Sequence, residues 1–175
     1  CSAFLIKQPE ILRKICSHGN FAHYLFLGDA EDVDLGRISL QCGRRNDALK
    51  LFLAWREKGD AGWARLVENY VELADYFQSK IENHSSLEMM SSRVWSNVCI
   101  RYTANGIEHN VLNKELRDRL VKSGKFMISQ SKIRENIILR PVIANSSVGK
   151  KTIDELIDEI TRIGDDIVRG IPFSY

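Results

Sequence analysis

The longest regular pattern in this sequence is a one-sided stripe of apolar residues between Trp63 and Ile81. Apolar side chains recur there at spacings of three and four residues, which is the repeat of an α-helix that buries one face. The pattern predicts a helix of about five turns that packs against a core, and such a stripe is more typical of packing than of ligand binding. A shorter helix is predicted before it, over residues 46–58, and Gly59 is expected to end that helix.

The first forty residues predict smaller elements. Residues 2–7 are rich in Phe, Leu and Ile and are expected to form a strand. Pro9 then suits the first turn of a helix, which is predicted over residues 10–17. Residues 28–36 are acidic, flanked by glycines and without periodicity, so we expect an exposed loop there.

The second half of the sequence changes to short apolar runs separated by amphipathic helices. The predicted strands are residues 87–90, 94–102, 126–129 and 137–143. The predicted helices are residues 110–123 and a last one that opens at Thr152 with the form of a capping box. This order indicates an α/β or α+β domain with a small, mainly antiparallel sheet. We place a domain boundary between residues 82 and 83.

Composition and charge exclude several classes of protein. The chain is 44% hydrophobic and 27% charged, as in ordinary globular proteins. Its net charge is +2, and its basic and acidic residues are interspersed. The sequence therefore lacks the basic cluster that binds nucleic acid or an anionic membrane surface. No apolar run approaches the roughly 18 residues of a membrane span, and a cytoplasmic location is expected. The scattered cysteines and histidines lack the spacing of a metal site, and none is predicted.

Two basic features are candidates for binding an anion. Arg44 and Arg45 precede a predicted helix, where free backbone N–H groups could add to their charge; pairing with the acidic loop is the alternative, and we favour it. Arg140 interrupts the apolar run 137–143. A charge in such a place is costly unless it is paired or faces a cleft, so Arg140 is either in a structural ion pair or available to an anionic ligand. The residues alone leave both alternatives open.

The most specific motif in the sequence is Gln-Cys-Gly-Arg-Arg at residues 41–45, within a longer characteristic segment over residues 39–55. Further characteristic segments are residues 1–7, 24–26, 97–99, 139–140 and 142–146. In order and spacing, these segments resemble the glutamate and cysteine-sulfinate decarboxylases, which are group II pyridoxal-phosphate-dependent amino-acid decarboxylases. The resemblance covers essentially the whole chain and corresponds to the C-terminal part of such an enzyme.

The resemblance implies an α/β fold of the aspartate-aminotransferase type, in an obligate dimer with pyridoxal 5'-phosphate as cofactor. Residues 1–82 would be the end of the cofactor-binding large domain with a connecting helix, and residues 83–175 the small C-terminal domain. The lysine that forms the Schiff base would lie upstream of the segment matching Cys1. No catalytic residue is therefore assigned within this chain, and the isolated chain is expected to be inactive.

The resemblance also implies roles for a few positions. Arg140 matches the arginine that is expected to bind the substrate carboxylate. Gln41, Cys42 and Gly43 match residues that reach the active site of the neighbouring subunit. Residues 28–38 match a mobile loop that closes over the reacting centre; many members carry a tyrosine there, which this loop lacks.

The implied function is decarboxylation of glutamate, aspartate or cysteine sulfinate to an amine and carbon dioxide. The partners would be the amino-acid substrate and either a second copy of the protein or a complementing N-terminal portion. Two alternatives remain: a non-catalytic lobe or dimerisation fragment without the cofactor lysine, and an aminotransferase of the same fold.

Overall fold

The computed structural model describes residues 4–8, 10–16, 35–39 and 45–172. The chain divides into two compact units, Cys1–Gly59 and Asp60–Tyr175. The predicted boundary between residues 82 and 83 concerns the domains of a whole enzyme and stays a prediction. Within this chain the second compact unit begins earlier than that boundary, because the second half of the long helix packs into its core.

The first unit contains α1 (Glu10–Cys16), the short 3-10 helix η2 (Leu35–Ile38) and the beginning of α2. The helix predicted over residues 10–17 is confirmed. The strand predicted over residues 2–7 is wrong in its described part, because residues 4–7 lie outside any strand and Leu5 is 90% exposed. An apolar run becomes a strand only when a neighbouring strand pairs with it, and none of the described residues does so. Most of the predicted acidic loop lies outside the described residues.

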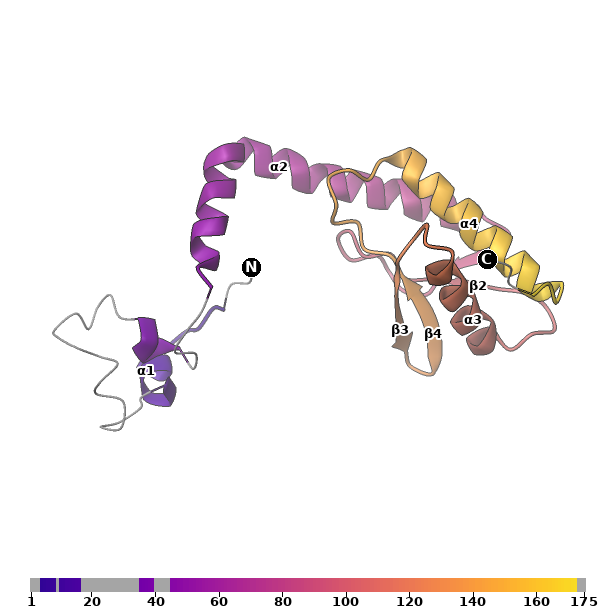
Figure 1. Ribbon diagram of the computed structural model, residues 1–175, viewed down its shortest axis with the longest axis horizontal. Coiled ribbons are helices and arrows are strands. Elements are labelled where there is room, and N and C mark those ends of the chain that lie inside the picture. Colours follow the sequence, from indigo (N-terminus) through magenta and orange to yellow (C-terminus); the bar gives the residue numbers. More distant parts are fainter. Residues whose placement is uncertain (1–3, 9, 17–34, 40–44, 173–175) are drawn as a thin grey trace. The chain divides into compact units, whose positions relative to one another are not determined.

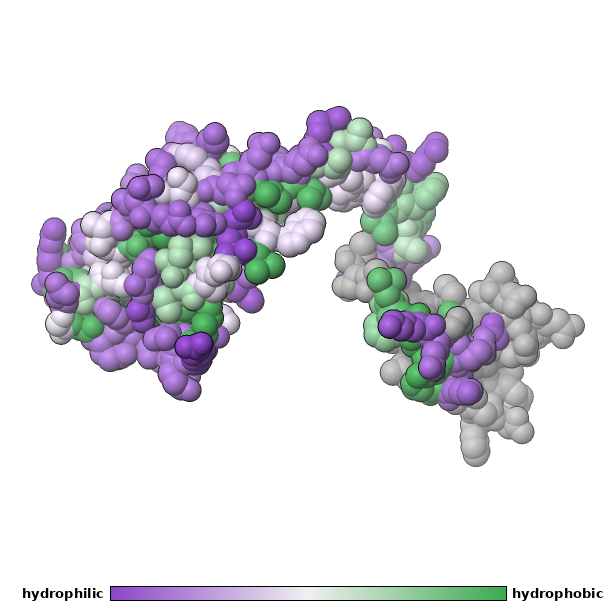
Figure 2. Space-filling view, turned by 180° about the vertical axis from the view of Figure 1, so that it is seen from behind, coloured by the Kyte–Doolittle hydropathy of each residue, from purple (hydrophilic) through white to green (hydrophobic). Residues whose placement is uncertain are grey.

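The helix α2 (Asp47–Glu82) consists of two helices that meet at Gly59. Gly59 has φ 65° and ψ 175°, a left-handed conformation that glycine adopts at little cost. The prediction of two helices separated at this glycine is confirmed. Figure 2 shows hydrophobic residues exposed on the first of them, where Phe52 is 58% and Leu53 57% exposed.

The second unit is built on a four-stranded antiparallel sheet of β1 (Leu87–Met89), β2 (Ile100–Tyr102), β3 (Ser129–Ile133) and β4 (Asn136–Arg140). The strands lie in the order β1-β2-β4-β3, which confirms the predicted small antiparallel sheet. Helices α3 (His109–Lys122) and α4 (Lys150–Val168) pack against it, as Figure 1 shows.

β1 ends one residue before the predicted 87–90, and the other three strands differ further from prediction. β2 is shorter than the predicted 94–102, because the chain turns at Trp95, which has φ 57°. β3 begins at Ser129, where the predicted strand ends, and its polar sequence is stabilised by pairing with β4 rather than by its own pattern. β4 ends at Arg140, because the following Pro141 has no N–H for the ladder.

The two helix starts also differ from the sequence analysis. The predicted capping box at Thr152 is wrong: α4 begins at Lys150, its N-cap is Gly149, and no side chain caps it. Helix α3 is capped by Glu108, whose carboxylate accepts hydrogen bonds from the backbone N–H groups of Asn110 at 2.9 Å and Val111 at 2.7 Å. These two bonds lower the pKa of Glu108, because they favour its ionised form.

The core of the second unit joins all of its helices to one face of the sheet. Leu73, Phe77 and Ile81 from the second half of α2 are buried in it, which confirms the later part of the predicted packing face, whereas Val67 in its earlier part is exposed. Helix α3 adds Leu112, Leu116 and Leu120, and α4 adds Ile153, Ile160 and Ile163. The core therefore depends on three amphipathic helices that meet over a small sheet.

Tyr102 of β2 connects the sheet to both following helices. Its ring lies against Gly164 so closely that a Cβ at that glycine would be 2.4 Å from the ring. Its hydroxyl donates a hydrogen bond to Asp165 at 2.5 Å. Burial, with the Asp165 carboxylate beside it, raises the pKa of Tyr102 to about 12, so the hydroxyl keeps its proton near neutral pH.

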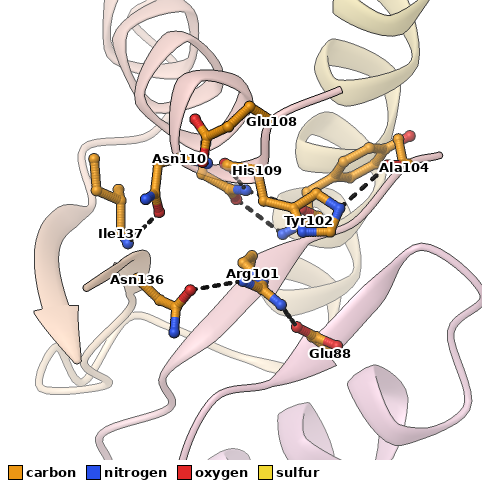
Figure 3. A network of polar contacts seen from close by, with 10 residues as sticks. Glu88, Arg101, Tyr102, Ala104, Glu108, His109, Asn110, Asn136 and Ile137 are labelled. Carbon is orange, nitrogen blue, oxygen red and sulfur yellow. Dashed lines mark hydrogen bonds and ion pairs between the residues drawn. The ribbon is translucent and has the colours of Figure 1, made fainter. Parts of the chain in front are cut away.

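A network of polar contacts holds α3 to the sheet (Figure 3). The fully buried Asn113 accepts a hydrogen bond from the backbone N–H of Tyr102 and donates to its carbonyl oxygen, at 2.9 and 2.8 Å. Asn110 fixes the β3–β4 turn, since its amide donates to the Glu135 carbonyl and accepts from the Ile137 N–H at 2.7 Å. Together these contacts fix the position of β4 and of the residue at its end.

We expect Gly164→Ala to lower the free energy of unfolding by about 1–3 kcal/mol, because the added methyl group meets the Tyr102 ring. Helix propensity alone predicts the opposite sign, a gain of about 1 kcal/mol. Chemical denaturation measures the difference. Gly149→Ala is the control, because nothing lies within 4 Å of its added Cβ; we expect a change of at most about 1 kcal/mol. A more stable Gly164→Ala variant would contradict the packing described.

We expect Asn113→Leu to cost about 2–4 kcal/mol, because it leaves the buried N–H and carbonyl groups of Tyr102 without partners. The exposed Asn83→Leu, which removes one hydrogen bond to the Ser79 carbonyl, is the control and should cost less than about 1 kcal/mol. Both are measured by urea unfolding. Equal costs for the two variants would show that Asn113 has no special role.

Candidate functional site

Arg140 is the last residue of β4 and pairs with Ser129 at the start of β3. The two residues exchange hydrogen bonds: the Ser129 hydroxyl donates to the Arg140 carbonyl at 2.9 Å, and Arg140 Nε donates to Ser129 Oγ at 3.3 Å. The guanidinium is therefore held at Nε, while its two terminal nitrogens make no hydrogen bond with any described residue.

The alternation of the strand explains why a charge is tolerated in this apolar run. Leu139, Pro141 and Ile143 are buried, whereas Arg140 and Val142 between them are exposed. Since successive side chains of an extended chain point to opposite sides, the guanidinium does not enter the core. Among the described residues Arg140 makes no ion pair, so the structural ion pair considered from the sequence is not found there.

The chain after Arg140 is fixed by the segment before β2. The Val98 N–H donates to the Pro141 carbonyl at 3.1 Å, and the Ile143 N–H donates to the Ser96 carbonyl at 3.0 Å. That segment is itself tied to α2 by Arg93, which pairs with Asp75 and also donates to the Trp95 carbonyl. Arg140 thus lies between two backbone segments that are both hydrogen-bonded to β4 or its extension.

Arg140 lines a pocket of about 410 Å³ in the second unit. Its walls are mainly apolar and come from α2, α4 and the segment before β3, including Phe77, Phe126 and Leu156. The polar lining side chains are Ser129, Thr152 and two arginines, Arg117 and Arg140. No Asp, Glu or Lys is among the described residues that line it. A pocket with positive charge and apolar walls attracts small anions.

Arg117 is a residue of this pocket that the sequence did not predict. It lies in α3 between Leu116 and the buried Leu120, as one of several charged residues on an amphipathic helix. Such a residue is ordinarily solvated, and no motif distinguishes it from its neighbours. Only the packing of α3 beside β4 brings it to the pocket of Arg140.

Four of the other predicted site residues, Gln41, Cys42, Gly43 and Arg44, lie outside the described residues, so their predicted roles stay predictions. Arg45 is exposed just before α2. Within the described ranges, no three His, Cys, Asp or Glu side chains gather in a way that could hold a metal ion. None of the helices described there combines the length and apolar character that crossing a membrane requires.

Comparison with known proteins identifies the family. Residues 1–103, more than half of the chain, match the model of the pyridoxal-dependent decarboxylase conserved domain. The chain belongs to the pyridoxal-dependent decarboxylase family. It is 34% identical to human cysteine sulfinic acid decarboxylase over 182 residues, an alignment that covers 95% of this chain and 37% of that protein.

Solved structures of this family share the fold. The crystal structure of mouse CSAD in apo form matches with a TM-score of 0.74 and 24% identity, over 90% of this chain and 34% of that one. Tryptophan decarboxylase from Catharanthus roseus, in complex with L-tryptophan, matches with a TM-score of 0.70 and 24% identity, over 77% of this chain and 29% of that one. The predicted aminotransferase-like α/β fold is confirmed. The chain spans about a third of the length of these relatives.

Pyridoxal 5'-phosphate needs a lysine to form its imine, and no lysine is among the described residues that line the pocket of Arg117 and Arg140. The lining of this pocket therefore does not fit the attachment site of the cofactor, whereas its two arginines suit an anion. The resemblance already implied that the cofactor lysine lies outside this chain, and that placement stays a prediction.

Proposed function

We propose that this chain contributes the carboxylate-binding part of a pyridoxal-phosphate-dependent decarboxylase that acts on glutamate, aspartate or cysteine sulfinate. The observation that carries the proposal is the exposed guanidinium of Arg140, which has no acidic partner among the described residues and lines a pocket without acidic side chains. Relatedness to human cysteine sulfinic acid decarboxylase supports an acidic substrate.

In the reaction, this chain would bind and orient the amino-acid substrate. The guanidinium of Arg140 would hold an acidic group of the substrate through charge-assisted hydrogen bonds. Ser129 keeps Nε in place, which leaves both terminal nitrogens for the ligand. The apolar walls would exclude water and strengthen this contact. The cofactor, held elsewhere in the enzyme, would accept the electrons of the bond that breaks.

The proposal includes a homodimer or a complementing N-terminal portion as partner. Exposed apolar residues on the first half of α2 support it, since patches of this kind mark interaction surfaces. Gln41, Cys42 and Gly43 just before that helix would reach the active site of the neighbouring subunit. Residues 28–38 contain no tyrosine, so another group would protonate the product after decarboxylation.

A second candidate function is a non-catalytic lobe, which is favoured because no lysine is among the described residues that line the pocket. We expect the isolated chain to show no cofactor absorbance with pyridoxal phosphate. The protein extended by its upstream coding sequence should show that absorbance and release carbon dioxide from an acidic amino acid. Cofactor binding without carbon dioxide release from any acidic amino acid would refute the decarboxylase. A keto-acid product in place of the amine would indicate an aminotransferase.

We expect Arg140→Ala, in the extended protein, to raise the KM for the acidic amino acid about tenfold to a hundredfold and to leave cofactor binding intact. The variant removes one charge-assisted contact of about 1.5–3 kcal/mol. Steady-state kinetics and cofactor absorbance measure the two effects. Lys132→Ala, which removes a positive charge from the same hairpin outside the pocket, is the control and should leave the KM unchanged. An unchanged KM in Arg140→Ala would refute the assigned role.

A further inference from the structure

We propose that Arg117 is a second anion-binding residue in the pocket of Arg140 and makes this pocket select small molecules with two acidic groups over those with one. The inference rests on the proposed function only in taking this pocket as the substrate site. Arg117 would then be a specificity-determining residue, one that distinguishes a doubly acidic substrate from a singly acidic one.

The two arginines come from different elements but are anchored on consecutive residues. Arg117 of α3 donates from Nε to the Ile128 carbonyl, and Arg140 of β4 donates from Nε to the Ser129 hydroxyl. Because Ile128 and Ser129 are adjacent in the chain, the two guanidinium groups are held close to the same short stretch of backbone. Both side chains line the same pocket.

The hydrogen bonds of Arg117 and Arg140 are longer than those that Arg119 and Arg162 make. The contacts of Arg117 with the Ile128 carbonyl and with the Asp118 carboxylate are both 3.4 Å long, at the outer limit of hydrogen bonding. Arg119, two residues further along the same helix, instead holds Glu115 at 2.8 Å and the Ile171 carbonyl at 2.7 Å. Arg162 of α4 likewise holds Glu159 at 2.7 Å. Arg117 and Arg140 therefore retain donors for a ligand.

No acidic side chain is among the described residues that line this pocket, and Asp118 contacts Arg117 at 3.4 Å from outside the lining. Glu155, Asp158 and Glu159 of α4 line a neighbouring hollow, which shares Phe126 and Thr152 with this pocket. The pocket of Arg117 and Arg140 has two positive charges, no negative charge among its described lining residues, and mainly apolar walls. Apolar walls exclude water and strengthen the attraction between these charges and an anion. Its volume of about 410 Å³ accommodates a small dicarboxylate.

The test compares two probes of equal carbon count, glutarate with two carboxylates and pentanoate with one. Neither carries an amino group, so binding is measured without any reaction, by NMR titration of the isotope-labelled 175-residue chain. We expect glutarate to bind about tenfold more tightly than pentanoate, as one further charge-assisted contact predicts. Arg117→Gln should abolish this preference and change pentanoate binding less than about twofold. Arg117→Lys, which keeps the charge, should retain part of it.

Lys122→Gln is the matched control, because it removes the same charge from the exposed end of the same helix and lies outside the pocket. It should leave the glutarate preference unchanged. The proposal is overturned if the unaltered chain binds neither probe or both equally, if Arg117→Gln keeps the preference, or if Lys122→Gln loses it. If Arg117→Gln loses NMR signal dispersion, the variant is unfolded and Arg117→Lys decides instead. Arg117→Lys must then still prefer glutarate, or the proposal is overturned. This test does not measure carbon dioxide release. The binding proposal can therefore fail while the decarboxylase assignment stands, and the decarboxylase assignment can fail while the binding proposal stands.

Discussion

The geometry of the second unit depends on the contacts of Tyr102 with two helices. Its backbone is bonded to Asn113 of α3, its ring lies against Gly164 of α4, and its hydroxyl is bonded to Asp165. One residue at the end of β2 thereby fixes two helices on the sheet. Since β2 also pairs with β4, the same contacts set where α3 lies relative to the strand that ends in Arg140. The candidate site is thus positioned by the buried core behind it.

Charge and apolar surface are arranged differently on the two sides of this unit. Around Arg140 the walls are apolar, and the only charged lining groups among the described residues are guanidinium groups. Along α4, by contrast, acidic and basic side chains pair with one another, as in the contacts of Glu159 with Arg162 and Lys125. Pairing satisfies the charges along α4, whereas Arg140 makes no ion pair with a described residue and Arg117 has only the 3.4 Å contact with Asp118. This difference supports the proposal that this member of the pyridoxal-dependent decarboxylase family recognises acidic molecules.

Much of the fold could be predicted because its signals are local. The apolar stripe that ends at Ile81 and the break at Gly59 depend on residues within a few turns of each other, and both are confirmed. Signals that depend on pairing were less reliable. β3 has a polar sequence that forms a strand only because β4 lies beside it. The four-residue pattern at Thr152 does not cap α4, because that helix begins two residues earlier, at Lys150.

The sequence by itself determined the family, the amphipathic helices, the antiparallel sheet and Arg140 as a candidate. It could do so because helical periodicity, glycine conformation and short motifs are properties of neighbouring residues. Only the tertiary structure decided that Arg140 stands on the exposed side of its strand and that Arg117 lines the same pocket. These two residues are brought together by the packing of a helix on a sheet, and the direction of each side chain depends on contacts with residues distant in the chain.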